Sequence, residues 1–168
     1  MRQLRIKSDL CHVQNEIMST CVYDYSLLNE ERDSYQPGWL NETIETYSSS
    51  IRQSFEYKSS EELDTYIYVG NHGSYFGGGY VYEFRGRLSD LQSNLSQLHG
   101  LGWIDNQTRG VIIQLTLYNP NVQLFTSVTF LIEILSTGGI YPTSRFEPID
   151  FYGIFFSFSK IKKKLFLF

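Results

Sequence analysis

Few residues of this sequence combine the types and the spacing that catalysis or metal binding requires. The three histidines, His12, His72 and His99, are far apart, and no metal-ligand spacing links them. No histidine accompanies a nucleophile motif, and no pair of carboxylates has an informative spacing; Asp105, beside Trp103, is the nearest candidate for an acid. We therefore expect no enzyme activity, no metal site and no bound cofactor.

A glycine-rich segment could cradle a phosphate group. Residues 70–79 contain several glycines, but no Lys-Ser or Lys-Thr pair follows them, as a phosphate loop requires. The surrounding residues, Tyr66 to Phe84, have the character of strands. We expect these glycines to serve tight turns or close backbone contacts instead.

Two kinds of covalent modification are consistent with the sequence. Cys11 and Cys21, the two cysteines, could close a small disulfide loop in an oxidising compartment, but two unrelated reduced thiols fit the spacing equally well. N-glycosylation sequons begin at Asn41, in a polar segment, and at Asn106, in an expected turn. A third sequon begins at Asn94, inside an expected helix, and is a poorer acceptor.

The composition indicates one ordered domain. The chain has 168 residues, enough for a sizeable core, and its net charge of −4 gives no case for nucleic-acid binding. Charged residues make up only 19% and aromatic residues 16%, which indicates either an aromatic-rich β core or apolar surface kept for a partner. The acidic cluster at residues 29–33 lacks the pattern of a calcium loop, so we expect a solvated loop there.

No targeting or membrane segment is evident. No apolar stretch typical of a secretory signal follows the basic first residues, and no run of about 18 apolar residues exists. The chain therefore has the character of an isolated domain or a fragment, with a cytosolic globular protein as the alternative. The final segment, residues 151–168, combines aromatic residues with four lysines, Lys160 and Lys162 to Lys164, which would be costly inside a bilayer.

The longest strand-like pattern lies between Trp103 and Pro148. Alternate residues from Val111 to Leu117 fall on one face of a strand, and Ile113 and Leu115 are expected in the core. The segment Tyr118 to Asn121 has the residues of a turn, and a second strand follows it up to Leu135. We predict a long β-hairpin in the middle of a sheet.

A helix is predicted from Ser89 to His99. Ser89 and Gln92 have the spacing of a capping box, and Leu91, Leu95 and Leu98 recur at helical spacing. Together with the strands, this helix predicts an α+β fold, with an antiparallel sheet of about four or five strands and helices packed on one face.

The region around the hairpin resembles the polycystin family of membrane channels, in the block W-L-D-x-x-T-R, Y-N-x-N-x-N-L-F, V-E-F-x-A-T-G-G-x-x-P and F-x-P. The opening residues resemble the family's first strand, and the glycine-rich segment resembles a further element of its domain. The residues that match the block are Trp103-Ile104-Asp105, Thr108-Arg109, Leu117-Tyr118-Asn119, Asn121-Val122, Leu124-Phe125, Leu131-Ile132-Glu133, Thr137-Gly138-Gly139, Pro142 and Phe146-Glu147-Pro148.

The resemblance implies a particular domain and its role. It covers residues 1–150, as the extracytosolic polycystin or TOP domain between the family's first and second membrane helices, where four such domains pack above a cation-conducting pore. Structural roles are implied for the motif residues Trp103, Asp105, Arg109, Tyr118, Asn119, Gly138, Gly139 and Pro142. From their short separation we expect Asp105 to pair with Arg109. The family also carries a disulfide near its opening strand, which favours a Cys11–Cys21 bridge.

The implied function is assembly and gating of a tetramer with other polycystin-like subunits, attached to the membrane through helices of a parent protein. Three alternatives remain: a secreted or cell-surface module that binds a glycan or protein, a non-functional gene fragment, and, last, an enzyme. Residues 151–168 begin like the approach to the second membrane helix, and a truncated gene model is favoured over a segment lying at a membrane interface.

Overall fold

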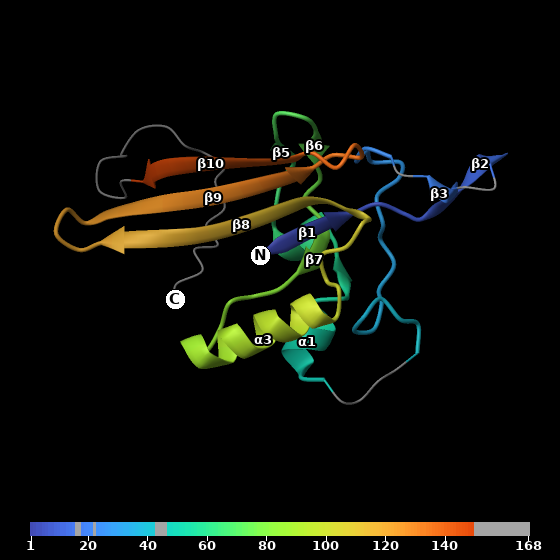
Figure 1. The fold of residues 1–168 in the computed structure, drawn as a ribbon. Coiled ribbons are helices and arrows are strands. Elements are labelled where there is room, and N and C mark those ends of the chain that lie inside the picture. Colours follow the sequence, from blue (N-terminus) through green and yellow to red (C-terminus); the bar gives the residue numbers. More distant parts are fainter. Residues whose placement is uncertain (16–17, 22, 43–46, 150–168) are drawn as a thin grey trace.

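A six-stranded antiparallel sheet forms the centre of the molecule (Figure 1). The computed structural model describes residues 1–15, 18–21, 23–42 and 47–149, and for residues 9–15 and 18–21 it describes the backbone alone. The sheet has the order β10-β9-β8-β1-β7-β4. Its strands are β1 (Arg2–Arg5), β4 (Tyr57–Lys58), β7 (Gly79–Val81), β8 (Thr108–Asn119), β9 (Leu124–Ile134) and β10 (Ile140–Ile149).

Two small ribbons and three helices complete the described part of the fold. The ribbons pair β2 (Asp9–Asn15) with β3 (Met18–Cys21) and β5 (Tyr68–Val69) with β6 (Ser74–Tyr75). The helices are α1 (Ser49–Gln53), α2 (Ser60–Leu63) and α3 (Leu88–Gly100). The fold is mostly antiparallel sheet with few helices, as expected, but the main sheet exceeds the predicted four or five strands. The strands β4 and β7 have only two and three residues, too few to show a periodic pattern.

One face of the sheet packs against α1 and α3, which lie on the same side of it (Figure 1). Trp103 is buried there, and its indole N–H donates a hydrogen bond of 2.7 Å to the carbonyl oxygen of Ser54, at the end of α1. A buried indole needs such a partner. Trp103 thereby joins the loop before β8 to the helical layer, within a buried cluster of Ile51, Phe55, Tyr80, Tyr82, Leu98 and Trp103.

The opposite face is covered near β1 by the β5–β6 ribbon. Tyr75 of β6 is buried there and stacks on Tyr25, with ring centroids 5.3 Å apart. Gly110 of β8 makes this packing possible, because a Cβ at that position would lie 2.8 Å from the Tyr75 ring. The buried cluster on this face consists of Leu4, Tyr75, Ile112 and Leu131.

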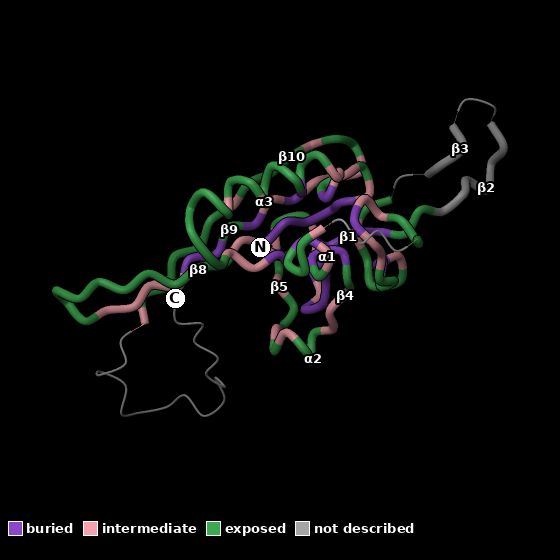
Figure 2. The backbone as a smooth tube through the Cα atoms, turned by 90° about the horizontal axis from the view of Figure 1, so that it is seen from below, coloured by how far each residue is buried: buried purple, intermediate pink, exposed green. Residues whose placement is uncertain are grey.

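The predicted β8–β9 hairpin is confirmed, but its burial differs from the prediction. Val111 and Ile112, on opposite faces, are 2% and 1% exposed, whereas Leu115 is 38% exposed and Leu117 55%. The expectation that Leu115 lies in the core is wrong, and Ile113 is only partly buried, because none of the described layers extends far enough to cover the distal half of the hairpin. Figure 2 shows this half projecting from the body as a largely exposed arm.

The predicted helix is confirmed as α3, but its expected capping box is not. The N-cap residue is Arg87, which makes no side-chain capping bond, and the Ser89 hydroxyl donates to Asp90 instead. A capping box is present in α2, where the Ser59 and Glu62 side chains each accept a bond from the other's backbone N–H. No described helix is both long and apolar enough to cross a membrane.

The acidic segment near residue 30 is not the solvated loop that was expected. Glu30 and Glu31 are 3% and 6% exposed. Glu30 accepts hydrogen bonds of 2.8 Å from the Tyr25 hydroxyl and from the Arg32 guanidinium, so its buried charge has partners. This segment runs beside β1 and belongs to the body of the domain, as the Ile6–Glu30 bridge shows.

Candidate functional site

The turn before β8 is organised by the carboxylate of Asp105. Arg5, from β1, donates to Asp105 Oδ2 at 2.6 Å, and its guanidinium lies 3.9 Å from the ring centroid of Trp39. The backbone N–H of Gln107 and the hydroxyl of Thr108 donate to Asp105 Oδ1 at 3.0 and 3.2 Å. These three donors hold the turn in place, so the Asp105 carboxylate has a structural role.

Arg109 has partners other than the expected one. The predicted pair of Asp105 with Arg109 is wrong, because the Asp105 carboxylate forms its ion pair with Arg5. The Arg109 side chain is instead buried and donates to the carbonyl oxygens of Tyr23, at 2.7 Å, and of Asn106 and Thr108, both at 2.8 Å. Burial lowers the pKa of this guanidinium. Arg109 thus ties the start of β8 to the segment that follows β3.

A buried carboxylate on β9 holds the β5–β6 ribbon. Glu133 is 0% exposed and accepts hydrogen bonds from the backbone N–H groups of Asn71 and His72, at 3.1 and 2.9 Å, and from the Tyr75 hydroxyl, at 3.1 Å. His72 Nδ1 lies 3.3 Å from the same carboxylate, and the His72 ring packs on Tyr141 of β10. Sequence reasoning assigned Glu133 no role, although a lone acidic residue in an apolar strand is a signal of such a contact.

The electrostatics of this cluster favour the charged carboxylate. Burial alone would raise the pKa of Glu133, but the hydrogen bonds from His72, Asn71 and Tyr75 outweigh it, and the pKa lies below its ordinary value. Burial and the neighbouring Glu133 charge raise the pKa of Tyr75, which stays a neutral donor. Among the described residues, no group of three or more His, Cys, Asp or Glu is placed to hold a metal ion.

The projecting arm carries a row of exposed apolar residues on one face. We call Leu115, Leu117, Phe130 and Phe146 the apolar stripe. The ladder places Leu115 opposite Val128 and Val128 opposite Phe146, so these side chains share the face directed to the side of α3. The four are 36% to 60% exposed. The other face carries the polar residues Gln114, Thr116, Ser127, Arg145 and Glu147, and near the turn the aromatic pair Tyr118 and Phe125.

Comparison with known proteins decides the family. The sequence model of the family described as "Polycystin domain" matches residues 1–152. The chain belongs to the polycystin domain family. It is 32% identical to "Location of vulva defective 1" of Caenorhabditis elegans, 30% to "Polycystin-2" of Danio rerio and 29% to "Polycystin-2-like protein 1" of Homo sapiens, in each case over 89% of this chain. It spans only 5%, 16% and 17% of these relatives.

The remaining motif residues of this polycystin domain shape the turns at the two ends of β9. Tyr118 packs on Phe125 across the hairpin, with ring centroids 4.5 Å apart, and the Asn119 side chain accepts a bond from the N–H of Asn121 in the turn. Gly138 has a φ of +87°, which a residue with a Cβ rarely adopts, and with Gly139 it forms the turn from β9 to β10.

Pro142 lies in β10, at the edge of the sheet. Pro142 pairs with Ile132, and Pro148 pairs with Thr126. The alternation of the ladder directs the nitrogen atoms of both prolines to the outer edge, where a missing N–H disturbs no existing bond. These two prolines weaken the edge as a template for another strand.

The predicted modification sites stay predictions. The register places Asp9 opposite Cys21, so Cys11 lies in the same ribbon, two positions from the residue that faces Cys21. The side chains of both cysteines lie outside the described ones. Asn41 and Asn106 are both exposed, although the third residue of the first sequon, Thr43, lies outside the described residues. The lysine-containing segment 151–168 also lies outside them.

Proposed function

We propose that this polycystin domain is the extracytosolic part of a cation-channel subunit, on the extracellular, ciliary or organelle-lumen side of a membrane. Its role is to help assemble a tetramer with like or related subunits and to influence gating. The observation that carries this proposal is the family match over residues 1–152. The relatives named polycystin-2 share this domain over most of the chain. The pore lies outside the chain, in a parent protein.

The apolar stripe supports a contact with a second subunit. Large apolar side chains on a protruding, hydrogen-bonded arm suit a protein interface, whereas a lone exposed leucine needs no explanation. The opposite face, which is polar between the body and the Tyr118–Phe125 pair near the turn, supports a one-sided contact. Because Pro142 and Pro148 weaken the edge of β10, the contact would use the face of the arm and not strand addition.

A chimeric channel tests the proposal. Residues 1–149 would replace the corresponding domain of Polycystin-2 of Danio rerio, and we expect tetramers by cross-linking and a cation current in whole cells. The double substitution Leu117→Asp and Phe146→Asp should reduce tetramers and current severalfold, because it charges the apolar stripe. Leu28→Asp, at a position 92% exposed and away from the arm, is the matched control. A chimera that assembles and conducts equally with the charged stripe would contradict the assembly role.

The extracytosolic placement also predicts a disulfide between Cys11 and Cys21. The loop between them is short, so the bond would stabilise the domain by about 2–3 kcal/mol, chiefly by restricting the unfolded chain. Non-reducing mass spectrometry of protein from a secretory host should find the cross-linked peptide. The same material should carry glycans at Asn41 and Asn106. Two free thiols in folded, secreted protein would argue against both the bond and the compartment.

A further inference from the structure

A cavity of about 410 Å³ lies beside β4, at the edge of the main sheet opposite to β10. Pockets that bind small molecules typically have roughly 300–1,000 Å³, so this volume suits a compact ligand. Four separate segments form its walls: residues 30–32, the junction of β4 and α2, residues 65–67 and residues 76–78. Because segments so distant in the sequence meet there, no local motif marks the cavity.

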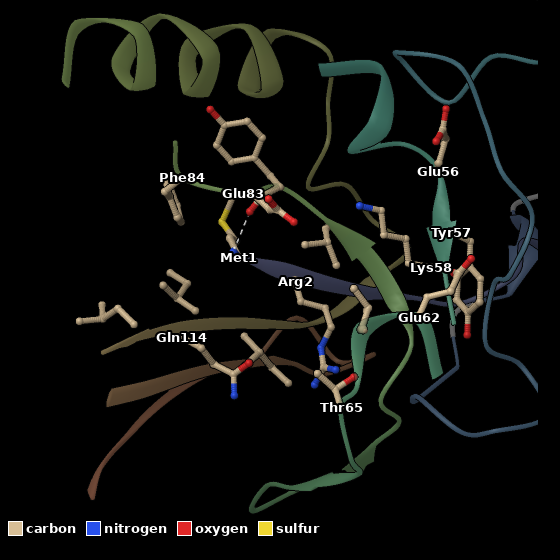
Figure 3. A pocket seen from close by; sticks show the side chains of 16 residues that line it. Met1, Arg2, Glu56, Tyr57, Lys58, Glu62, Thr65, Glu83, Phe84 and Gln114 are labelled. Atoms are coloured by element: carbon tan, nitrogen blue, oxygen red, sulfur yellow. Dashed lines mark hydrogen bonds between the residues drawn. The ribbon is translucent and has the colours of Figure 1, made fainter. Parts of the chain in front are cut away.

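Gly77 and Gly78 form one wall of the cavity, and their surroundings leave no room for a side chain. A Cβ on Gly77 would clash with the Thr65 carbonyl oxygen, and a Cβ on Gly78 would clash with the Tyr57 hydroxyl. The Gly77 carbonyl oxygen accepts hydrogen bonds from the Thr65 hydroxyl, at 2.5 Å, and from the guanidinium of Arg2. Figure 3 shows the Arg2 and Thr65 side chains directed toward each other. These contacts hold the wall in place, so the cavity is preformed.

A buried carboxylate and a partly exposed guanidinium lie side by side in the cavity. The Glu30 side chain is 2% exposed, and it accepts hydrogen bonds of 2.8 Å from the Tyr25 hydroxyl and from Arg32 Nε. The Arg32 side chain is 52% exposed, and its Nη2 also lies 2.8 Å from Glu30. Within the described part of the chain, Nη1 of Arg32 remains available to donate, and the carboxylate oxygens have further lone pairs. The pair therefore offers donors and acceptors next to each other.

Aromatic side chains form further walls of the cavity. Tyr57 and Phe76 are partly buried, whereas Tyr66 is 77% exposed at the opening. The face of an aromatic ring carries partial negative charge, so it attracts the polarised C–H groups of a sugar ring and also offers apolar contact. Burial, together with the charge of Glu30, raises the pKa of Tyr57, so its hydroxyl stays neutral.

The charges in the cavity favour a neutral ligand. Among the described residues, Glu30 and Arg32 are the charged ones that line it, and their charges compensate each other. A ligand carboxylate bound to Arg32 would be repelled by Glu30, and a ligand ammonium group bound to Glu30 would be repelled by Arg32. Hydroxyl groups both donate and accept, so they can bond to the two side chains at once. Ser59 and Ser60 add hydroxyl groups to the same lining.

We propose that this cavity binds a neutral pyranose sugar, whose hydroxyl groups bond to Glu30 and Arg32 and whose ring packs against Tyr66. A free saccharide and the terminal unit of a glycan present the same groups to such a site. The cavity lies at the edge of the sheet opposite to β10, away from the apolar stripe. The proposal therefore goes beyond the assembly role and does not depend on it.

Titration of the full 168-residue chain with sugars, followed by NMR, tests the proposal. The probes are methyl α-D-mannopyranoside, methyl β-D-galactopyranoside, methyl N-acetyl-β-D-glucosaminide and lactose. We expect at least one of them to shift the amide signals of Gly77 and Gly78 saturably, with a dissociation constant of about 1 mM or weaker for so small a ligand. Tighter binding of lactose than of the methyl galactoside would identify the end of a glycan as the ligand, and equal binding would identify the free sugar.

Two pairs of variants locate the binding. Tyr66→Ala should weaken the binding of the sugar by about fivefold or more, whereas Tyr66→Phe keeps the ring and should leave it within about twofold. Arg32→Lys keeps the positive charge beside Glu30 but loses the planar set of donors, so it should weaken binding by a similar factor. Arg145→Lys is its matched control, because Arg145 forms a pair of the same length with Glu147 on the arm.

Three results would overturn the proposal. One is the absence of a saturable shift with any of the four sugars up to their solubility. Another is binding that Tyr66→Ala and Arg32→Lys both leave unchanged, since the sugar would then bind elsewhere. The third is tighter binding of choline or acetate than of any sugar, since the cavity would then select a charged ligand. Tetramer formation by the chimeric channel is measured separately, so each of these results leaves the assembly proposal standing.

Discussion

The two halves of the β8–β9 hairpin have the same strand pattern and opposite environments. In the half near β1, Ile112 and Leu131 are 1% and 0% exposed. In the projecting half, Leu115 and Leu117 are 38% and 55% exposed, although the hydrogen-bonded pairing continues to Asn119 and Leu124. The alternation of apolar residues therefore reports that a strand forms, but not what covers it.

The covering layers come from distant parts of the chain. Trp103 brings the end of α1 to one face of the near half, through its bond to Ser54. Glu133 brings the β5–β6 ribbon to the other face, through Asn71, His72 and Tyr75. Within the described residues, no comparable contact reaches the projecting half. We infer that the two halves of the hairpin have different roles. The near half stabilises the domain, and the far half exposes the apolar stripe.

The largest expected effect is a difference in the free energy of unfolding when the same substitution, Leu→Ala, is made in each half of the hairpin. Leu131→Ala removes a side chain that is fully buried and should lower the free energy of unfolding by about 2–5 kcal/mol, through lost burial and a cavity. Leu117→Ala, made in the projecting half, is the matched control and should cost less than about 1 kcal/mol. Urea unfolding of both variants measures this, and equal costs would mean that the far half is also packed.

A smaller loss is expected when the contact that covers the near half is weakened. Glu133→Gln keeps the shape of the side chain but removes the charge that accepts the hydrogen bonds of Asn71, His72 and Tyr75, and it should cost about 2–3 kcal/mol. Glu31→Gln is the control for loss of a buried charge elsewhere in the body.

The pH dependence of the same contact has a defined sign. The folded pKa of Glu133 lies below the ordinary value of 4.5, so the carboxylate stabilises the fold at higher pH. This stabilisation is lost as the pH falls from the unfolded pKa through the folded one. Unfolding below about pH 5 should therefore depend more steeply on pH in the wild-type protein than in Glu133→Gln. Identical pH profiles would show that Glu133 is not the charged acceptor.

The sequence predicted the regular elements better than the contacts between them. The hairpin and α3 have long periodic patterns, and both were found with small differences at their ends. Asp105 and Arg109 were recognised as structural, but their partners, Arg5 and the Tyr23 carbonyl, are separated from them by most of the chain. No local spacing can report such a contact.

The same limit explains the buried acids and the extra strands. Glu30 stands in a charged run typical of a solvated loop, but it is buried beside β1, where Tyr25 and Arg32 donate hydrogen bonds to its carboxylate. β4 and β7 are recognisable only from their pairing with each other and with β1. The family motif block lies in the correct region, but it did not distinguish the residues that stabilise the arm from those exposed on its surface.

The smallest expected effect on stability is that of the apolar stripe, and it is the sharpest test of the division between the two halves. Leu117→Thr with Phe146→Thr replaces two exposed apolar side chains with a strand-compatible polar residue, so the free energy of unfolding should change by less than about 0.5 kcal/mol. Weak self-association of the wild-type domain, measured by light scattering over a concentration series, should nevertheless be lost in this variant. It is expected to be weak because an isolated interface lacks the effective concentration that a shared membrane anchor supplies. A variant that unfolds much more easily, or that associates as the wild type does, would show that the apolar stripe is not an exposed surface used for association.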